Sequence, residues 1–313
     1  MVKNAVRDRL PFPLLIRLYY FSLRFRYYPV YEASRRRLGA PLLDSMDLWR
    51  YKTSDTLFVL GSGPSINRIS AQRWEAIARH DSVGFNFWPY HRFVPTFYFF
   101  ESGRNHAQGE AYHKMAAARA EEYRNVPKVL MDLCHPGYQY VYDLPAGWRE
   151  NLYVAYTIPA IARTDEEFGY VVRLLKKRGA FAPESRIRYL LKHCATLSTL
   201  VTLGAKLQYK RIVLCGVDLT TNEYYYQDPE LYPESKDVEL VPRARKHATL
   251  TRYCWGNTPI DVVLEELRRQ VLEPAGIELY LEHDGSALYP RIPRAPEWVF
   301  AAGVGAAYEG GAR

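Results

Sequence analysis

The segment at 61–65 contains the residue types that bind phosphate through the backbone. It reads Gly-Ser-Gly-Pro-Ser and directly follows an apolar run at 56–60. Glycines permit a tight turn and a close backbone approach to a phosphate, and serines supply hydroxyls. The pattern is neither the dinucleotide motif nor the Walker motif, because Ile66 stands where a third glycine belongs and no Gly-Lys-Ser/Thr follows. A purely structural turn is an equal alternative to a binding loop made of Gly61, Ser62, Gly63 and Ser65.

An asparagine ends the next apolar segment, at 82–87. Asn86 stands between two phenylalanines. Its side-chain amide can donate and accept hydrogen bonds at once, which suits recognition of a nucleotide base or a ribose. A turn or capping asparagine is the alternative, so Asn86 is a candidate binding residue that the sequence alone does not settle.

The segment from 216 to 226 combines an acidic strand end with three consecutive tyrosines. It begins Gly-Val-Asp after the apolar run 211–215 and reaches Tyr-Tyr-Tyr through a polar loop. Phenol hydroxyls can bond phosphate oxygens without adding charge, although the rings can equally pack beneath a loop. The candidate residues of this segment are Gly216, Asp218, Tyr224, Tyr225 and Tyr226.

Two histidines are candidate general bases, because the pKa of imidazole lies near working pH. His247 lies in a basic loop that reads Arg-Ala-Arg-Lys-His-Ala-Thr. His283 follows the last apolar segment and competes for the same role. A lone histidine is more often structural than catalytic, so residue type alone does not choose between them.

These segments need a scaffold that brings strand ends together, and the hydrophobic pattern predicts one. Continuous apolar runs, typical of strands buried on both faces, alternate with segments of helical spacing. We therefore expect an α/β, Rossmann-like fold with a mostly parallel sheet covered by helices on both faces, binding ligands at the carboxyl ends of its strands. The predicted strands are 56–60, 82–87, 96–100, 128–133, 151–156, 211–215 and 278–281, and the predicted helices are 71–79, 187–207 and 260–272.

The positive charge of the chain is concentrated at its N-terminus. The net charge is +8, and residues 1–37 contain nine basic and two acidic side chains, which is +7 of it. A nucleic-acid-binding surface needs basic residues spread over the folded domain, so this distribution argues against that class. Arg17 and Arg24 flank an apolar stripe at helical spacing, formed by Leu14, Leu18, Phe21 and Phe25. The pattern suits attachment of residues 1–37 to an anionic membrane surface, and a helix packed on the domain is the alternative.

Composition limits the remaining classes. A hydrophobic fraction of 48% is too high for a disordered chain. The four cysteines form no C-x-x-C pair and lie in apolar contexts, which indicates buried thiols in a reducing compartment. No apolar run approaches the roughly 20 residues that span a bilayer, and the N-terminus lacks the pattern of a signal peptide. We therefore expect a cytoplasmic protein.

Taken together, the polar segments resemble the bacterial sialyltransferases of glycosyltransferase family 42, which decorate lipooligosaccharide. The family has Gly-Asn-Gly-Pro-Ser where this chain has 61–65, and an asparagine in the position of Asn86. The run 207–218 is similar to the family's Leu-Gly-Tyr-Lys segment, which leads through a strand into Gly-Ile-Asp. The other similarities are to its phosphate-binding tyrosines (224–226), its catalytic histidine (His247), and its last strand with the serine beyond (277–286).

The resemblance implies a GT-A-like single nucleotide-binding domain that uses a CMP-activated sugar, sialic acid-like or Kdo-like. The sugar would pass with inversion to a cell-surface glycan or glycolipid, with His247 as general base and the tyrosines bonding the departing phosphate. Thr196 and Ser286 would complete the donor site. No cofactor is implied, and no metal, since the chain lacks an Asp-x-Asp clamp. Ser62 replaces the family's asparagine, and Ala-Thr-Leu at 195–197 replaces its Thr-Ser-Gly, which leaves the transferred sugar open.

We expect a basic aromatic arm at 1–50, a nucleotide-sugar-binding catalytic domain at 51–295 and a flexible tail at 296–313. The arm would hold the protein on the inner face of the bacterial membrane, and a homo-oligomer is left open. A pyrophosphokinase-like enzyme shares the motif islands but needs Mg²⁺ carboxylates, of which Asp218 is the placed candidate. A non-catalytic, membrane-associated protein of glycan assembly is the third class.

Overall fold

The structure is a computed structural model. It describes residues 10–101, 106–131, 140–236, 238, 247–250 and 258–301.

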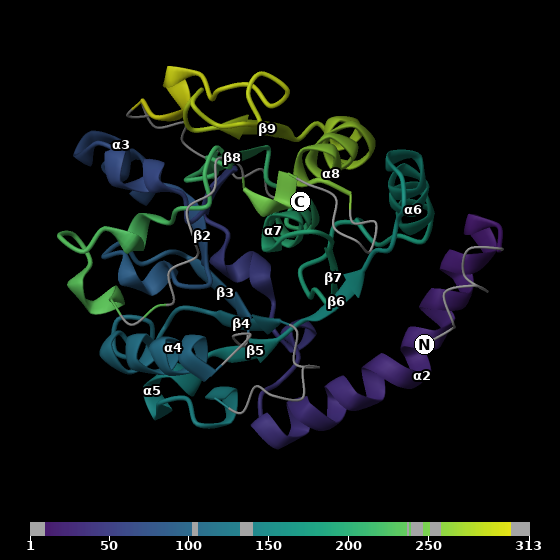
Figure 1. Ribbon diagram of the computed structural model, residues 1–313, viewed down its shortest axis with the longest axis horizontal. Coiled ribbons are helices and arrows are strands. Elements are labelled where there is room, and N and C mark those ends of the chain that lie inside the picture. Colours follow the sequence, from purple (N-terminus) through teal and green to yellow (C-terminus); the bar gives the residue numbers. More distant parts are fainter. Residues whose placement is uncertain are drawn as a thin grey trace, which may run out of the picture.

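A sheet of seven strands runs through the described chain in the order β5-β4-β3-β2-β1-β8-β9 (Figure 1). Every pairing in it is parallel. The central strand is buried along its whole length, as its continuous apolar run predicts. The strands are β1 (Thr56–Leu60), β2 (Asp81–Phe85), β3 (Phe97–Glu101), β4 (Lys128–Met131), β5 (Leu152–Val154), β8 (Arg211–Cys215) and β9 (Glu278–Leu281).

Helices cover both faces of this sheet, which confirms the predicted α/β, Rossmann-like architecture (Figure 1). They are α3 (Ala71–Ala78), α4 (His106–Ala118), α5 (Ala146–Arg149), α6 (Asp165–Lys177), α7 (Thr196–Lys206) and α8 (Ile260–Leu267). In β1, Leu57 and Val59 belong to the hydrophobic core beneath α6, α7 and α8. Phe58 and Leu60 point the other way, into the core beneath α3 and α4. The alternation of side chains along a strand thus supplies two cores from one apolar run.

The predicted helix at 187–207 is wrong in its first part. Tyr189–Lys192 forms strand β7, which pairs in parallel with β6 (Tyr156–Pro159) in a second, two-stranded sheet. Leu190 and Leu191 are both buried, and so short an apolar run has no periodicity that separates strand from helix. Cys194, with φ 65, lies between β7 and the start of α7.

The N-terminal arm is a single long helix, α2 (Phe12–Leu38). It ends at Gly39, whose φ of 72 places it in the left-handed region and whose N–H donates to the carbonyls of Arg35 and Arg36. One face of α2 packs on the β6–β7 sheet: Ile16 is buried, and the Tyr31 hydroxyl donates to Ala155 O. The predicted N-terminal helical arm is confirmed.

Helix α8 lies between β8 and β9 in the chain, and the tail follows β9. The predicted helix at 260–272 is α8 continued by a π-helical turn, Arg268–Leu272. Of the tail predicted at 296–313, Val299 and Phe300 are buried, and residues 302–313 lie outside the described residues. Among the described helices, none combines the length and apolarity needed to cross a membrane.

Candidate functional site

The carboxyl ends of β1 and β8 lie side by side where the strand order changes direction. From β1 the order runs outwards through β2 to β5 on one side, and through β8 to β9 on the other. In open α/β sheets, ligands bind in the crevice at such a switch point. The segments at 61–65 and 216–218 both begin here, because β1 ends at Leu60 and β8 ends at Cys215.

Close packing explains the glycines of the 61–65 loop. Gly63 N–H donates to Gly216 O at 2.7 Å. A Cβ on Gly61 would lie 2.5 Å from the same oxygen, and a Cβ on Gly63 would overlap Asp218 Oδ2. The two glycines therefore let the loops after β1 and β8 touch, so the structural alternative accounts for them without a ligand.

The Asp218 carboxylate holds these loops together. Ser65 N–H donates to Oδ2 at 2.9 Å, and His283 Nε2 lies 2.9 Å from Oδ1. Burial alone would raise the pKa of Asp218, but His283 and the Ser65 N–H outweigh it and lower that pKa. The carboxylate in turn raises the pKa of His283. Both oxygens of Asp218 thus have partners within the protein.

Both ring nitrogens of His283 face groups of the protein. Its Nε2 faces Asp218, and its Nδ1 accepts a hydrogen bond from Gly285 N–H at 3.0 Å. A general base needs a ring nitrogen whose lone pair is open to the substrate. His283 therefore joins the end of β9 to the β8 loop as a structural residue.

Asn86 keeps its side chain available while its backbone is fixed. Its φ of 52 lies in the left-handed region, which asparagine tolerates better than most residues. Its N–H donates to Phe99 O at 2.9 Å, and its carbonyl accepts the Tyr98 hydroxyl. The half-buried amide has no hydrogen-bond partner in the described part of the chain, and neither has the half-buried hydroxyl of Ser62. These two side chains are the open polar groups of the β1 and β2 ends.

The three tyrosines divide into packing residues and one candidate. Tyr225 is fully buried, and its hydroxyl donates to the carbonyls of Phe87 and Trp88, both at 3.0 Å. A phosphate bound by Tyr225 would have to displace these two backbone acceptors from its hydroxyl. Tyr226 is buried as well, with its ring stacked 5.3 Å from that of Tyr224. The half-buried Tyr224 is the tyrosine that remains a candidate.

Thr196 lies in a polar cluster that the sequence did not reveal. It opens α7, and its hydroxyl donates to Glu101 Oε1 at 2.5 Å. Lys192 Nζ lies 3.0 Å from the same oxygen. The predicted strand stopped at residue 100, one short of Glu101, although a carboxylate at a strand's carboxyl end was a signal that could have been used. Lys192 was hidden inside the incorrectly predicted helix.

Two other candidates support the β8 loop instead of facing a ligand. The Ser286 hydroxyl, expected in the donor site, is buried and donates to Val217 O at 2.5 Å. Gly216 has φ 62, and a Cβ there would lie 2.6 Å from Ile66 Cδ1. Both residues fix the shape of the loop that follows β8.

His247 is anchored beside that loop. Its backbone N–H donates to Leu219 O at 3.2 Å, and its ring lies edge-on to Tyr224, with centroids 6.5 Å apart. Nδ1 lies 2.8 Å from Thr249 Oγ1, whereas no described residue contacts Nε2. Partial burial lowers the pKa of His247, so the ring is neutral near pH 7. A neutral imidazole with one anchored nitrogen has the form that a general base requires.

The structure thus brings most of the predicted residues to one edge of the sheet. The polar candidates there are Ser62, Asn86, Tyr224 and His247, contributed by the ends of β1, β2 and β8 and by the segment after them. Cys194 Sγ lies 3.4 Å from Thr249 O and so ties the start of α7 to the His247 segment. Such a site can bind a polar ligand across the switch point and remove a proton beside it.

Comparisons with known proteins give one distant match. No protein-family model matches the chain, and no curated protein matches it. Among solved structures, a tyrosine-to-phenylalanine variant of the sialyltransferase CST-II in complex with CMP matches 78% of this chain and 87% of its own, with 16% identity and a TM-score of 0.39. Likeness at this level concerns the α/β fold alone.

Proposed function

We propose that this protein is a glycosyltransferase that moves a sialic acid-like or Kdo-like sugar from a CMP-activated donor to a cell-surface glycan or glycolipid. The observation that carries the proposal is the placement of His247. Its neutral ring has Nδ1 on Thr249 and an open Nε2, beside the loop that ends β8 at the switch point. The resemblance of the polar segments to the family 42 sialyltransferases supplies the donor class.

In the proposed reaction, His247 Nε2 takes the proton of the acceptor hydroxyl. The hydroxyl oxygen attacks the anomeric carbon from the face opposite the phosphate, so the configuration inverts. The bond from the anomeric carbon to the phosphate oxygen breaks, and CMP leaves with the electron pair. A base at Nε2 requires the proton on Nδ1, where it is donated to the Thr249 hydroxyl at 2.8 Å. The Thr249 backbone N–H also approaches Nδ1, at 3.3 Å, and because it can only donate it favours the opposite tautomer, so the Nδ1-protonated form is part of the proposal.

Asn86 and Ser62 would hold the nucleotide in this proposal, and Tyr224 would donate to the leaving phosphate. Thr196 would act through Glu101, because its hydroxyl already donates to that carboxylate. A pyrophosphokinase-like reaction is less well supported, since the carboxylate proposed for its Mg²⁺, Asp218, is held by Ser65 and His283.

Ligand-dependent thermal stability tests the donor class. In buffer with EDTA, we expect CMP to raise Tm by several degrees, and CTP, ATP and NAD to have little effect. A ligand at about 100 times its Kd adds about 2.7 kcal/mol to the stability of the fold. The Asn86→Gly variant should lose the CMP response, because glycine adopts the left-handed φ but lacks the side-chain amide of asparagine.

Asn151→Gly is the matched control, since Asn151 has the same φ of 52 but precedes β5 at the amino end of the sheet. It should keep the CMP response. A response to ATP that requires Mg²⁺ would favour the pyrophosphokinase-like enzyme, and no response to any nucleotide would favour the non-catalytic protein.

We also propose that the N-terminal arm attaches the protein to the inner face of an anionic membrane, near a lipid-linked acceptor. The concentration of basic residues in 1–37 supports this location.

A further inference from the structure

The outer face of α2 is apolar and exposed. Leu14, Leu18, Phe21 and Phe25 are 46%, 48%, 65% and 61% exposed, and the rings of Phe21 and Phe25 lie 5.0 Å apart. The helix packs on the domain through its opposite side, where Ile16 is fully buried. The stripe is therefore not the packing face of α2, although the helix does pack on the domain through its other side, as the alternative left open by the sequence predicts. Exposed apolar side chains in a continuous row mark an interaction surface.

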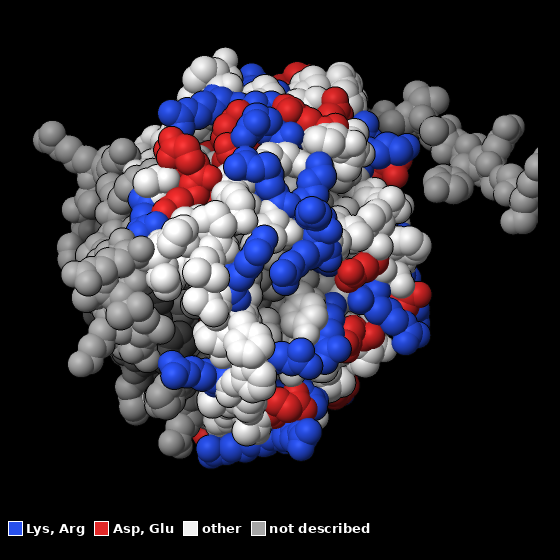
Figure 2. All heavy atoms as spheres, turned by 90° about the vertical axis from the view of Figure 1, so that its right-hand side faces the viewer, with Lys and Arg blue, Asp and Glu red and all other residues white. Residues whose placement is uncertain are grey.

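Unpaired cations adjoin this stripe on α2 itself. At about 100° per residue, Arg17 and Arg24 fall on the flank between the stripe and Tyr20. Neither guanidinium has a carboxylate partner among the residues that the structure describes. Figure 2 shows the face on which α2 lies, where Lys and Arg side chains gather around its middle. A protein partner with an apolar groove would not need these unpaired cations, whereas an anionic lipid surface would attract them.

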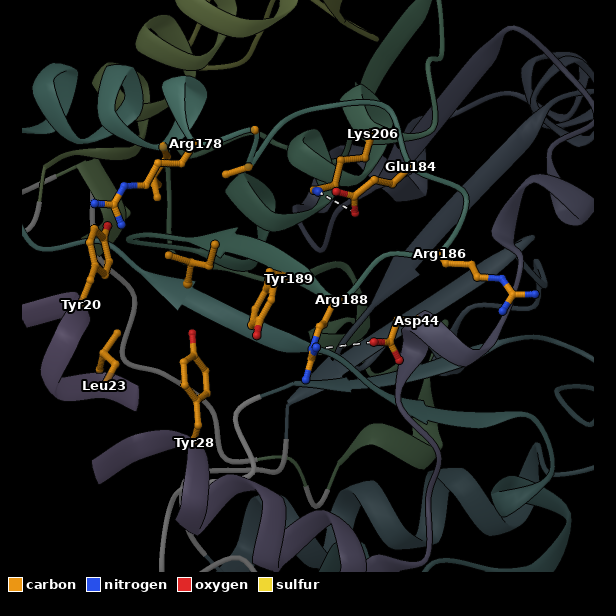
Figure 3. A pocket seen from close by; sticks show the side chains of 14 residues that line it. Tyr20, Leu23, Tyr28, Asp44, Arg178, Glu184, Arg186, Arg188, Tyr189 and Lys206 are labelled. Atoms are coloured by element: carbon orange, nitrogen blue, oxygen red, sulfur yellow. Dashed lines mark ion pairs between the residues drawn. The ribbon is translucent and has the colours of Figure 1, made fainter. Parts of the chain in front are cut away.

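A cavity of about 680 Å³ opens between α2 and the β6–β7 sheet, on the same flank. Tyrosines from both sides enter it, and basic residues from the loop between α6 and β7 surround it (Figure 3). Two of the lining cations are already neutralised: Arg188 lies 3.7 Å from Asp44 and Lys206 lies 3.1 Å from Glu184. Arg178 has no carboxylate partner in the described ranges, and it extends toward Tyr20 in Figure 3.

The Tyr20 hydroxyl makes this cavity suited to an anion. It is buried without a hydrogen-bond partner in the described structure. A buried hydroxyl without a partner is costly, and a phosphate oxygen between Tyr20 and Arg178 would satisfy both groups. The apolar lining from Leu23, Ile158 and Leu175 would contact the glycerol and first acyl carbons of a lipid.

This cavity is separate from the candidate catalytic site. Lys206 lines the cavity at the last residue of α7, whereas Thr196 begins α7 at the carboxyl edge of the sheet. An α-helix of this length spans about 15 Å. A lipid in the cavity would therefore leave the nucleotide site open.

We propose that α2 lies flat on an anionic bilayer, with its outer stripe inserted between headgroups and a phospholipid phosphate bound in the cavity by Arg178 and Tyr20. The proposal deepens the membrane attachment included in the proposed function and does not depend on the transferase reaction. It assigns attachment to two surfaces: the stripe on the N-terminal arm, and a cavity lined by both the arm and the domain.

Vesicle flotation of the full-length protein tests this surface. We expect binding to phosphatidylcholine vesicles that contain phosphatidylglycerol, and weak binding to pure phosphatidylcholine. The Phe21→Glu/Phe25→Glu variant should bind at least about tenfold more weakly to both, because it places charge in the inserted stripe. Leu231→Glu, an equally exposed apolar residue (56%) on the loop after the tyrosines, should bind like the parent.

The Arg178→Gln/Tyr20→Phe variant tests the cavity separately. It should lose about fivefold in affinity for phosphatidylglycerol vesicles and nothing on phosphatidylcholine, since one unscreened cation is removed. Arg79→Gln, at the C-cap of α3, is the charge control and should bind like the parent. Every variant should keep its thermal response to CMP, which separates failure of this surface from failure of the proposed function. Unchanged flotation of the stripe variant would overturn the proposal, and unchanged flotation of the Arg178 variant would overturn its cavity part.

Discussion

At the scale of single residues, His247 and His283 differ in which ring nitrogen is left for a substrate. In His283, Nε2 faces the Asp218 carboxylate and Nδ1 accepts from Gly285 N–H. In His247, only Nδ1 contacts a described residue, Thr249. We expect His247→Ala to lower CMP release with a glycolipid acceptor by about 10²–10⁴-fold, the usual contribution of a general base. The CMP-induced rise in Tm should be unchanged, because the base acts on the acceptor.

Thr249 supplies the second half of this residue-level test. Thr249→Val should lower turnover in the same direction, because it removes the acceptor that holds the proton on Nδ1, and Thr249→Ser should restore it. His113→Gln, whose histidine contacts Asp143 O away from the site, is the control. Full activity of His247→Ala would show that the proposed base is wrong.

At the scale of elements, the ends of β1, β8 and β9 are joined through one ion pair, Asp218–His283. The folded-state pKa of His283 is raised, so its contribution is fully present below about pH 6.5 and is lost as pH rises through the raised pKa. The folded-state pKa of Asp218 is lowered, so its contribution is present above about pH 4 and is lost as pH falls through the lowered pKa. The pair therefore stabilises the fold most between about pH 4 and pH 6.5.

Thermal unfolding against pH measures this pair. The Tm difference between the parent and His283→Gln should be largest near about pH 5.5 and should shrink as pH rises through the raised pKa of His283. A His283→Gln difference that grows with pH would contradict the pairing.

The elements also show how far local pattern predicts this fold. The run that forms β1 and the segment that forms α8 were predictable, because burial on both faces and helical spacing leave local signatures. Strand β7 was missed, since its partner β6 lies some thirty residues earlier and four residues carry no period. The glycines of the 61–65 loop were recognised, but their reason, contact with the β8 loop, depends on chain about 150 residues away. The hydrogen bond between Thr196 and Glu101 could not be predicted either, because the two residues are far apart in sequence and meet only in the folded protein.

At the scale of the whole molecule, one face of α2 packs on the folded domain and the opposite face is exposed. Its inner face buries Leu15, Ile16 and Leu23, while Phe21 and Phe25 are exposed. Removing residues 1–38 would uncover the core beneath the inner face, so truncation does not isolate membrane attachment. Each buried side chain of this kind contributes about 1.5–3 kcal/mol.

We therefore expect deletion of residues 1–38 to lower Tm by on the order of 10 °C, from several lost side chains at about 2–4 °C per kcal/mol. Phe21→Glu/Phe25→Glu should leave Tm unchanged, because both side chains already lie in solvent. Differential scanning calorimetry without vesicles measures both variants. An unaltered Tm in the truncated chain would mean that α2 is an appendage, and the excess positive charge of the molecule would then belong to a detachable arm. A lowered Tm would mean that this charge is built into the same body that holds the nucleotide site, and the membrane surface and the catalytic edge would then keep a fixed relative orientation.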